Sequence, residues 1–283
     1  IDARNIVINR LTAQILRWPD LDISPLKTYD LSPRDTRLAQ AIYNHTIRRW
    51  ITLEYILNTY TNKNIKDMEP KMQAVLLVGA CQILFMDNIP DYAIVNESVS
   101  WAKNKIRPKA GSMVNAVLRK VIKLLDKVVP ANEIKSVQKP DKQLSDHDIQ
   151  CSTIPRSDGG MIYLNNPILP KQRNEQISIK TSHPLELIDL WTRSMPWQQA
   201  QNLALHNLII PPTIIYGIPN QEIIANECLI PHETTGFSLW TGDHEGLKQL
   251  LTQNPKAWVQ DPTSFDAIML SQNLDMSGKI ILD

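Results

Sequence analysis

The sequence is poor in cysteine and glycine and has no long apolar run. Its three cysteines in 283 residues, Cys81, Cys151 and Cys228, are odd in number and widely spaced, so neither a disulfide framework nor a zinc motif fits. Nine glycines and 19 prolines without a period exclude collagen-like and low-complexity classes. The longest nearly apolar run, residues 74–86, is interrupted by Gln82 and is far shorter than the ~20 residues that a membrane span needs. These absences favour a reducing cytoplasm and no membrane partner.

The two ends of the sequence point to a piece of a longer protein. The first residue, Ile1, is not an initiator methionine, and the early charges at Asp2 and Arg4 leave no apolar core for a secretory signal. The last run, Lys279 to Asp283, predicts a buried parallel strand, which needs a neighbouring strand on both sides. We therefore expect that the final domain is cut off.

Charge is distributed unevenly along this nearly neutral chain. Residues 1–130 hold 19 Lys+Arg and 12 Asp+Glu, a net charge of +7, whereas residues 131–283 carry −6. The positive excess is concentrated in residues 101–130, where only Asp126 is acidic, and its members are Lys103, Lys105, Arg107, Lys109, Arg119, Lys120, Lys123 and Lys127. Such a cluster predicts a polyanionic partner, most simply nucleic acid. On charge alone, a solvated helix face explains it equally well.

Apolar periodicity predicts helices through the first 128 residues. The expected helices span residues 3–16, 32–50, 53–57, 70–85, 90–102 and 111–125. Ser32, followed by Pro33 and Asp35, has the pattern of a capped helix start. The helix over 70–85 is apolar on nearly all sides, which places it at the centre of a bundle.

Beyond this bundle the pattern changes. The periodicity fails over residues 129–180, which predicts a long, partly ordered linker. An α/β subdomain is expected over 181–256, with one helix from 185 to 206 and a strand at 213–218. Residues 257–283 predict the first helix and strand of a further, Rossmann-like α/β domain. The expected fold class is therefore an all-helical bundle followed by α/β.

Several motifs resemble a known family. Asp35-Thr36-Arg37-Leu38-Ala39, Ile47-Arg48-Arg49-Trp50 and Val95-Asn96-Glu97-Ser98-Val99 are similar to NusB-like RNA-binding domains. The most specific run, Val114-Asn115-Ala116-Val117-Leu118-Arg119, is typical of the bacterial 16S rRNA cytosine-C5 methyltransferases of the Sun/RsmB type. In that family a NusB-like domain precedes the catalytic domain. The resemblance covers about residues 1–128 and, more weakly, 181–215 and 257–283.

The resemblance implies an enzyme that methylates a cytosine of small-subunit rRNA with S-adenosylmethionine, in which this segment binds the rRNA. The family's cofactor loop and its two catalytic cysteines match nothing in the 283 residues. The segment alone is thus expected to be inactive, with Asp283 at the edge of the cofactor loop. We expect a monomer that binds no metal and uses its bundle cations for RNA. These are Arg34, Arg37, Arg48, Arg49, Lys103, Lys105, Arg107, Lys109, Arg119, Lys120 and Lys123.

The sequence departs from the family pattern at two places. His45 stands where the family usually has a glycine, and Tyr216-Gly217-Ile218 stands where the family has Arg-Val-Asn, which weakens RNA handling by this strand. Purely structural explanations also remain open for some polar residues. Arg119 can pair with Glu97, and Asn96 and Asn115 are expected first as buried hydrogen-bonding groups.

The required chemistry bears on the cysteines and on the rival functions. Methylation at C5 of cytosine needs a thiolate that adds to C6, but Cys81 lies in the apolar helix and Cys151 and Cys228 lie in polar stretches, so none is expected to be catalytic. Asp261 is expected to cap the helix that starts at Pro262.

The alternative function is a non-catalytic NusB-like RNA-binding protein in antitermination or ribosome assembly. A protein–protein adaptor is disfavoured by the basic cluster.

Overall fold

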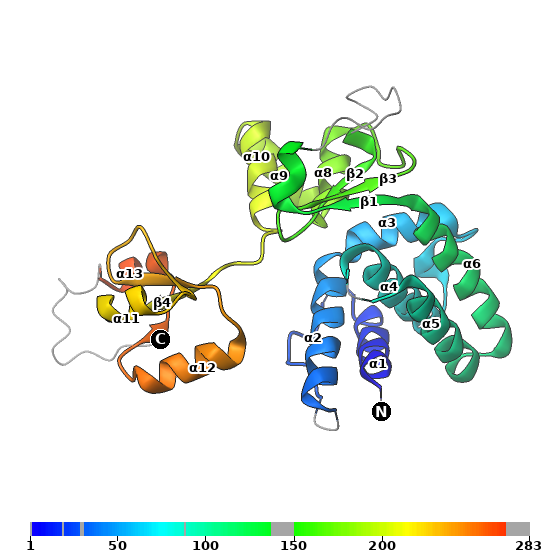
Figure 1. The fold of residues 1–283 in the computed structure, drawn as a ribbon. Helices are drawn as coiled ribbons and strands as arrows, with labels where there is room; N and C mark the ends of the chain where they lie inside the picture. The colour runs from blue at the N-terminus through cyan, green and yellow to red at the C-terminus, as the bar shows by residue number, and fades with distance from the viewer. Residues whose placement is uncertain (1, 19, 29–30, 88, 137–149, 270–283) are drawn as a thin grey trace, which may run out of the picture. The chain divides into compact units, whose positions relative to one another are not determined.

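The computed structural model describes residues 2–18, 20–28, 31–87, 89–136 and 150–269 (Figure 1). The chain divides into two compact units, Ile1–Ile209 and Ile210–Asp283. In the first unit, the described residues form a helical bundle, a small sheet and three further helices. The second unit is built around a separate sheet.

Six helices and a short 3₁₀ helix make up the bundle. They are α1 (Ala3–Ile15), α2 (Pro33–Arg48), α3 (Trp50–Tyr60), η1 (Ile65–Asp67), α4 (Pro70–Phe85), α5 (Asp91–Lys105) and α6 (Pro108–Leu124). The central helix is α4, which packs against all five of the others and has 14 of its 16 residues buried. The prediction from its all-round apolar surface is confirmed (Figure 1).

Local sequence signals determine where several helices begin. The Asp35 N–H donates to Ser32 Oγ at 3.2 Å, and the Ser32 hydroxyl donates to the Asp35 carboxylate at 2.8 Å, which confirms the predicted cap of α2. Helix α6 begins at Pro108, three residues before the predicted start, because proline suits the first turn of a helix. Gly79 lets α4 and α6 approach closely, since a Cβ there would lie 2.7 Å from Leu118 Cδ1.

The stretch predicted as a linker contains regular structure. It follows directly on β1 (Leu125–Val129) and holds η2 (Ala131–Ser136), β2 (Thr153–Pro155), β3 (Met161–Leu164) and most of α8 (Arg173–Thr181). The strands form an antiparallel sheet in the order β1-β3-β2. Strands of three to five residues are too short to leave a periodic signal, so the linker prediction fails over 150–181. Residues 137–149 lie outside the described residues.

This stretch belongs to the first unit because it is hydrogen-bonded to α3. The Thr52 hydroxyl donates to the Ile179 carbonyl at 2.5 Å, and the Ile51 N–H donates to Ser182 Oγ at 3.0 Å. The Tyr55 hydroxyl reaches the carbonyl of Ile168 at 2.6 Å. Polar groups of α3 that face this segment are thus satisfied by its backbone and by one serine.

Two helices complete the first unit, α9 (Leu185–Ser194) and α10 (Trp197–His206). The single helix predicted over 185–206 is wrong, because Pro196 interrupts it. Proline disfavours the helical conformation of the preceding residue, and Met195 is extended, with φ −147° and ψ 161°.

The described residues of the second unit, 210–269, form four strands and three helices. They are β4 (Thr213–Tyr216), α11 (Asn220–Ala225), β5 (Leu229–Pro231), β6 (Phe237–Trp240), α12 (His244–Gln253), β7 (Trp258–Val259) and α13 (Pro262–Met269). The predicted strand at 213–218 is present as β4, and α13 is the first helix predicted within 257–283, whereas α11, β5 and β6 do not follow from the sequence pattern. The sheet has the order β5-β6-β4-β7 and is antiparallel throughout.

A helical bundle followed by a sheet-containing region confirms the predicted fold class at that level. The described sheets differ from the expected parallel arrangement, since every strand pair in them is antiparallel. The parallel strand predicted at the end of the chain, including Asp283, lies outside the described residues. None of the described helices combines the length and the hydropathy needed to cross a bilayer.

Candidate RNA-binding surface

One face of α2 carries exposed arginines. Arg34, Arg37 and Arg48 are all exposed, and at about 100° per residue they lie within about 60° of one another around the helix axis. In the part of the chain that the structure describes, none of the three forms an ion pair or a side-chain hydrogen bond. We call this face the α2 arginine stripe. Its guanidinium groups are available to an anionic partner.

Arg49 differs from the prediction, because its side chain is buried rather than available to RNA. Its exposed fraction is 0%, and its guanidinium lies 4.6 Å from the centroid of the Phe85 ring. Nη1 donates to the Lys180 carbonyl at 3.2 Å and Nη2 donates to Ser157 Oγ at 3.3 Å. Burial lowers the pKa of Arg49 to about 9. Arg49 therefore joins the bundle to the segment that follows it.

A second group of cations lies on α5 and α6. We define the α5–α6 basic surface as the remaining predicted RNA-binding residues, all of them exposed: Lys103, Lys105, Arg107, Lys109, Arg119, Lys120 and Lys123. Lys103, Lys105, Lys109 and Lys123 have no ion-pair partner among the described residues. Lys127 is separate from them, since its Nζ lies 5.0 Å from the ring centroid of Tyr163 in the small sheet.

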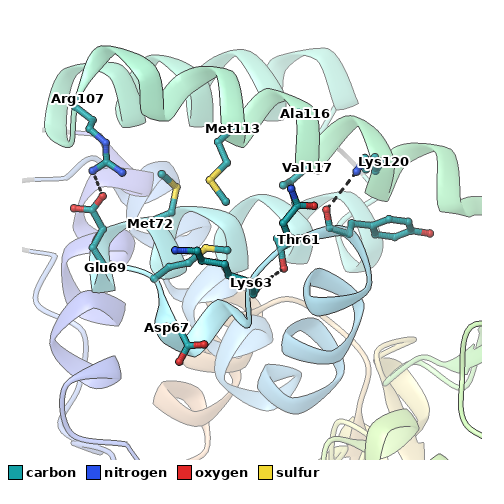
Figure 2. A pocket seen from close by; sticks show the side chains of 13 residues that line it. Thr61, Lys63, Asp67, Glu69, Met72, Arg107, Met113, Ala116, Val117 and Lys120 are labelled. Atoms are coloured by element: carbon teal, nitrogen blue, oxygen red, sulfur yellow. Dashed lines mark hydrogen bonds and ion pairs between the residues drawn. The ribbon is translucent and has the colours of Figure 1, made fainter.

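Two cations of this surface line a cavity of 730 Å³ between α3, η1, α4 and α6 (Figure 2). Figure 2 shows that Arg107, the residue directly before α6, and Lys120 of α6 reach across it. Arg107 forms an ion pair with Glu69 at the start of α4, and Lys120 Nζ donates to the Tyr60 carbonyl at 3.4 Å. The wall between them is apolar and consists mainly of Met72, Met113 and Val117. Sequence reasoning missed this cavity because its walls come from residues up to 60 positions apart.

Three interpretations of single polar residues are corrected by the structure. Arg119 Nε donates to Asn115 Oδ1 at 2.9 Å, so its partner is one turn away on α6 and is not Glu97. Asn96 is exposed and Asn115 is half-buried, so neither is the buried hydrogen-bonding group that was expected. The apolar sequence around Asn96 is misleading because α5 buries only one face.

The cysteines are not arranged for nucleophilic catalysis. Cys81 is fully buried in α4, as predicted, and burial raises the pKa of its thiol to about 12. Cys151 is also buried, and Cys228 is half-buried. Asp261 has the predicted capping role, since its carboxylate accepts the Thr263 N–H at 2.8 Å. The described residues contain no group of three or more His, Cys, Asp or Glu that could hold a metal ion.

Comparisons with known proteins agree with the architecture of the bundle. Residues 9–123 match the NusB family. The probable ribosomal RNA small subunit methyltransferase B of Bacillus subtilis is 23% identical over 271 residues, which is 92% of this chain and 51% of that protein. Ribosomal RNA small subunit methyltransferase B of Vibrio cholerae is 34% identical over 95 residues, 34% of this chain and 22% of that protein.

Two further comparisons, one with a NusB protein and one with a solved structure, agree with this similarity. Transcription antitermination protein NusB of Methylacidiphilum infernorum is 29% identical over 112 residues, 36% of this chain and 75% of that protein. The crystal structure of PH0851 overlaps 95% of this chain and 55% of its own, with a TM-score of 0.50 and 14% identity, which shows a shared fold.

The N-terminal helical bundle is therefore a NusB-family domain. Over nearly its whole length, the chain that contains this domain is a relative of ribosomal RNA small subunit methyltransferase B. It spans about half the length of that relative.

Proposed function

We propose that this chain is the rRNA-binding part of a methyltransferase that modifies small-subunit ribosomal RNA. The observation that carries the proposal is the set of exposed cations on α2 and on the α5–α6 basic surface that have no acidic partner among the described residues. Cations of this kind neutralise phosphates and release counterions, which gives affinity that is independent of sequence. The relative that extends over 92% of the chain is named as a probable methyltransferase of this RNA.

The distribution of charge favours the first unit as the RNA-binding part. Residues 1–209 carry a net charge of +7 and residues 210–283 carry −6. Phosphates are attracted to the first unit and repelled by the second. The RNA-binding role predicted for 181–256 is therefore proposed only for the portion before residue 210.

The finer proposal is that the target atom is C5 of a cytosine in 16S rRNA and that S-adenosylmethionine supplies the methyl group. The described residues do not fit this cofactor. They form only antiparallel sheets, without the parallel strand and glycine-rich turn that cradle a nucleotide-like cofactor. The Cys81 thiol is also unsuited to attack C6, because it is buried and its pKa is raised. No step of methyl transfer is assigned to these residues.

Two assays on the 283-residue chain test this function. In the first, a fragment of small-subunit rRNA is titrated with the chain at increasing salt, and we expect affinity that falls steeply with salt. In the second, the same RNA is incubated with the chain and radiolabelled S-adenosylmethionine, and we expect no incorporation of label. Methylation of the RNA by this chain would overturn the assignment of the chemistry, and salt-independent binding would overturn the role of the cations.

A non-catalytic NusB-like protein in antitermination or ribosome assembly is the rival function. It accounts for less of the sequence, because the similarity to the antitermination protein covers 36% of the chain whereas that to the methyltransferase covers 92%. We place the protein in the cytoplasm, where precursor rRNA is modified, and we expect it to act as a monomer.

A further inference from the structure

A second cavity of the bundle, of 450 Å³, lies beside the α2 arginine stripe. Its volume is in the range of about 300–1,000 Å³ that small-ligand sites occupy. One wall is α2, and the other is the end of α4 with the loop that follows. The lining residues are Arg34, Leu38, His45, Phe85, Met86, Asp87 and Ile89. The lining is largely apolar, with a few polar groups, as is usual for a site that holds a ring system.

The cavity and the arginine stripe belong to one face of α2. At about 100° per residue, Arg34, Leu38 and His45 lie within about 40° of one another around the helix axis. Arg37 and Arg48 lie beside these three residues on the same face of α2. All five residues fall within about 100° of one another around the helix axis. With a rise of 1.5 Å per residue, the stripe extends about 21 Å from Arg34 to Arg48. An RNA strand that follows the stripe therefore passes the mouth of the cavity.

Like Arg34, His45 lines the cavity without a side-chain partner among the described residues. It is half-buried, and no described residue forms a hydrogen bond with its ring. Burial, with the nearby charges of Arg49, Arg48 and Arg156, lowers the pKa of His45. The imidazole is consequently neutral at pH 7 and presents an apolar face together with hydrogen-bonding edges. His45 stands where the family that this sequence resembles usually has a glycine. The family pattern therefore assigns this ring no role in the bundle.

The acid in the lining is paired with an arginine. Arg156 donates to both carboxylate oxygens of Asp87, at 2.8 Å and 2.6 Å, and also forms an ion pair with Asp158 at 3.2 Å. The pairing weakens the repulsion between Asp87 and an approaching phosphate without cancelling it, because the arginine is shared by two carboxylates. Among the described residues that line the cavity, the charged group without a partner is Arg34 of the arginine stripe.

We propose that this cavity holds one unpaired RNA base, stacked on the His45 ring, while Arg34 and Arg48 contact phosphates on either side of it. Sequence-tolerant recognition of single-stranded RNA commonly combines such stacking on histidine or aromatic rings with a basic track for the backbone. A base in a duplex cannot enter the cavity, because it is paired and stacked within its helix. The site therefore discriminates unpaired from paired RNA. This inference rests on the proposed RNA binding of the chain.

The test compares two probes, a 12-nucleotide single-stranded RNA of mixed sequence and a 12-base-pair RNA duplex, by fluorescence anisotropy with the full chain. Removing one stacking contact costs about 1 kcal/mol or more, so His45→Ala is expected to weaken binding of the single strand about fivefold or more. Binding of the duplex should change less than twofold. His45→Phe keeps a stacking ring and should keep the affinity for the single strand within about twofold of wild type.

Lys103→Ala provides the matched control, because Lys103 is an exposed cation without an acidic partner on α5. It should weaken both probes by similar factors, whereas Arg34→Ala should weaken the single strand more than the duplex. Equal losses for the two probes in His45→Ala, or no loss for the single strand, would overturn the base site while leaving the proposed function intact. Failure of the wild-type chain to bind either probe would instead overturn the proposed function.

Discussion

Two adjacent arginines, Arg48 and Arg49, have opposite environments, and their alanine variants are expected to separate RNA affinity from stability. Arg48 is exposed and forms no ion pair with any described residue, whereas Arg49 is fully buried and donates to the Lys180 carbonyl and the Ser157 hydroxyl. We expect Arg48→Ala to lose RNA affinity with little change in stability. We expect Arg49→Ala to destabilise the first unit.

The size of the Arg49 effect follows from its contacts. Each hydrogen bond from a charged donor stabilises by about 1.5–3 kcal/mol, and because both bonds of Arg49 are long the lower figure applies. A desolvated cation–π contact with Phe85 adds about 2 kcal/mol. Desolvation of the unpaired charge offsets a part of this sum. Arg49→Ala should therefore cost about 3 kcal/mol, which is about 6–12 °C in the thermal transition of a unit of this size.

Arg49→Met is the informative companion, because it retains most of the side-chain volume and removes the buried charge. It should recover at least half of the lost stability. Thermal unfolding followed by circular dichroism measures these effects, with Arg48→Ala expected within about 0.5 kcal/mol of wild type. In RNA titrations, Arg48→Ala should lower the slope of log affinity against log salt by about 0.7 for a single strand. If Arg49→Ala unfolded at the same temperature as the wild type, the stabilising role of Arg49 would be refuted. If Arg48→Ala were destabilised as much as Arg49→Ala, the difference between the two arginines would be refuted.

Three other outcomes are expected. Gly79→Ala should destabilise the bundle by about 1–3 kcal/mol in urea unfolding, because its Cβ would clash with Leu118, and a wild-type midpoint would contradict this close packing. In the folded chain a thiol reagent should modify Cys228 first, since Cys81 and Cys151 are buried, and rapid labelling of all three would contradict the burial. Burial lowers the pKa of Lys180 to about 8, so between pH 8 and 10 the unfolded chain binds more protons at this group, and Lys180 contributes a rise in stability over that range that Lys180→Met should remove.

Much of the bundle could be predicted because its signals are local. The Ser32 cap, the prolines at helix starts and the all-round apolar face of α4 each depend on residues within a few positions of one another. The short strands could not be predicted in the same way. Ile154 and Ile162 are buried through pairing within a sheet whose third strand comes from residues 125–129, and no periodicity in three or four residues reveals this.

The positive charge of the candidate surface could be predicted from the sequence, but the environment of each charged side chain could not. Arg48 and Arg49 are identical neighbours in the sequence, and only a step of about 100° around the helix and the segment at 157–180 distinguish them. The pairing of Arg107 could not be predicted either, because its partner Glu69 is 38 positions away in the sequence. His45 departs from the family pattern in the sequence itself, but its place in a cavity depends on the end of α4.

The most direct test of the central claim is an RNA titration of this chain over a range of salt concentrations, with and without the substitutions Arg34→Ala, Arg37→Ala and Arg48→Ala combined. The wild-type chain should bind a small-subunit rRNA fragment with log affinity that falls linearly with log salt. The triple variant should bind more weakly, with a slope smaller by about 2. Equal affinities and equal slopes for the two chains would contradict the claim that the α2 arginine stripe binds RNA.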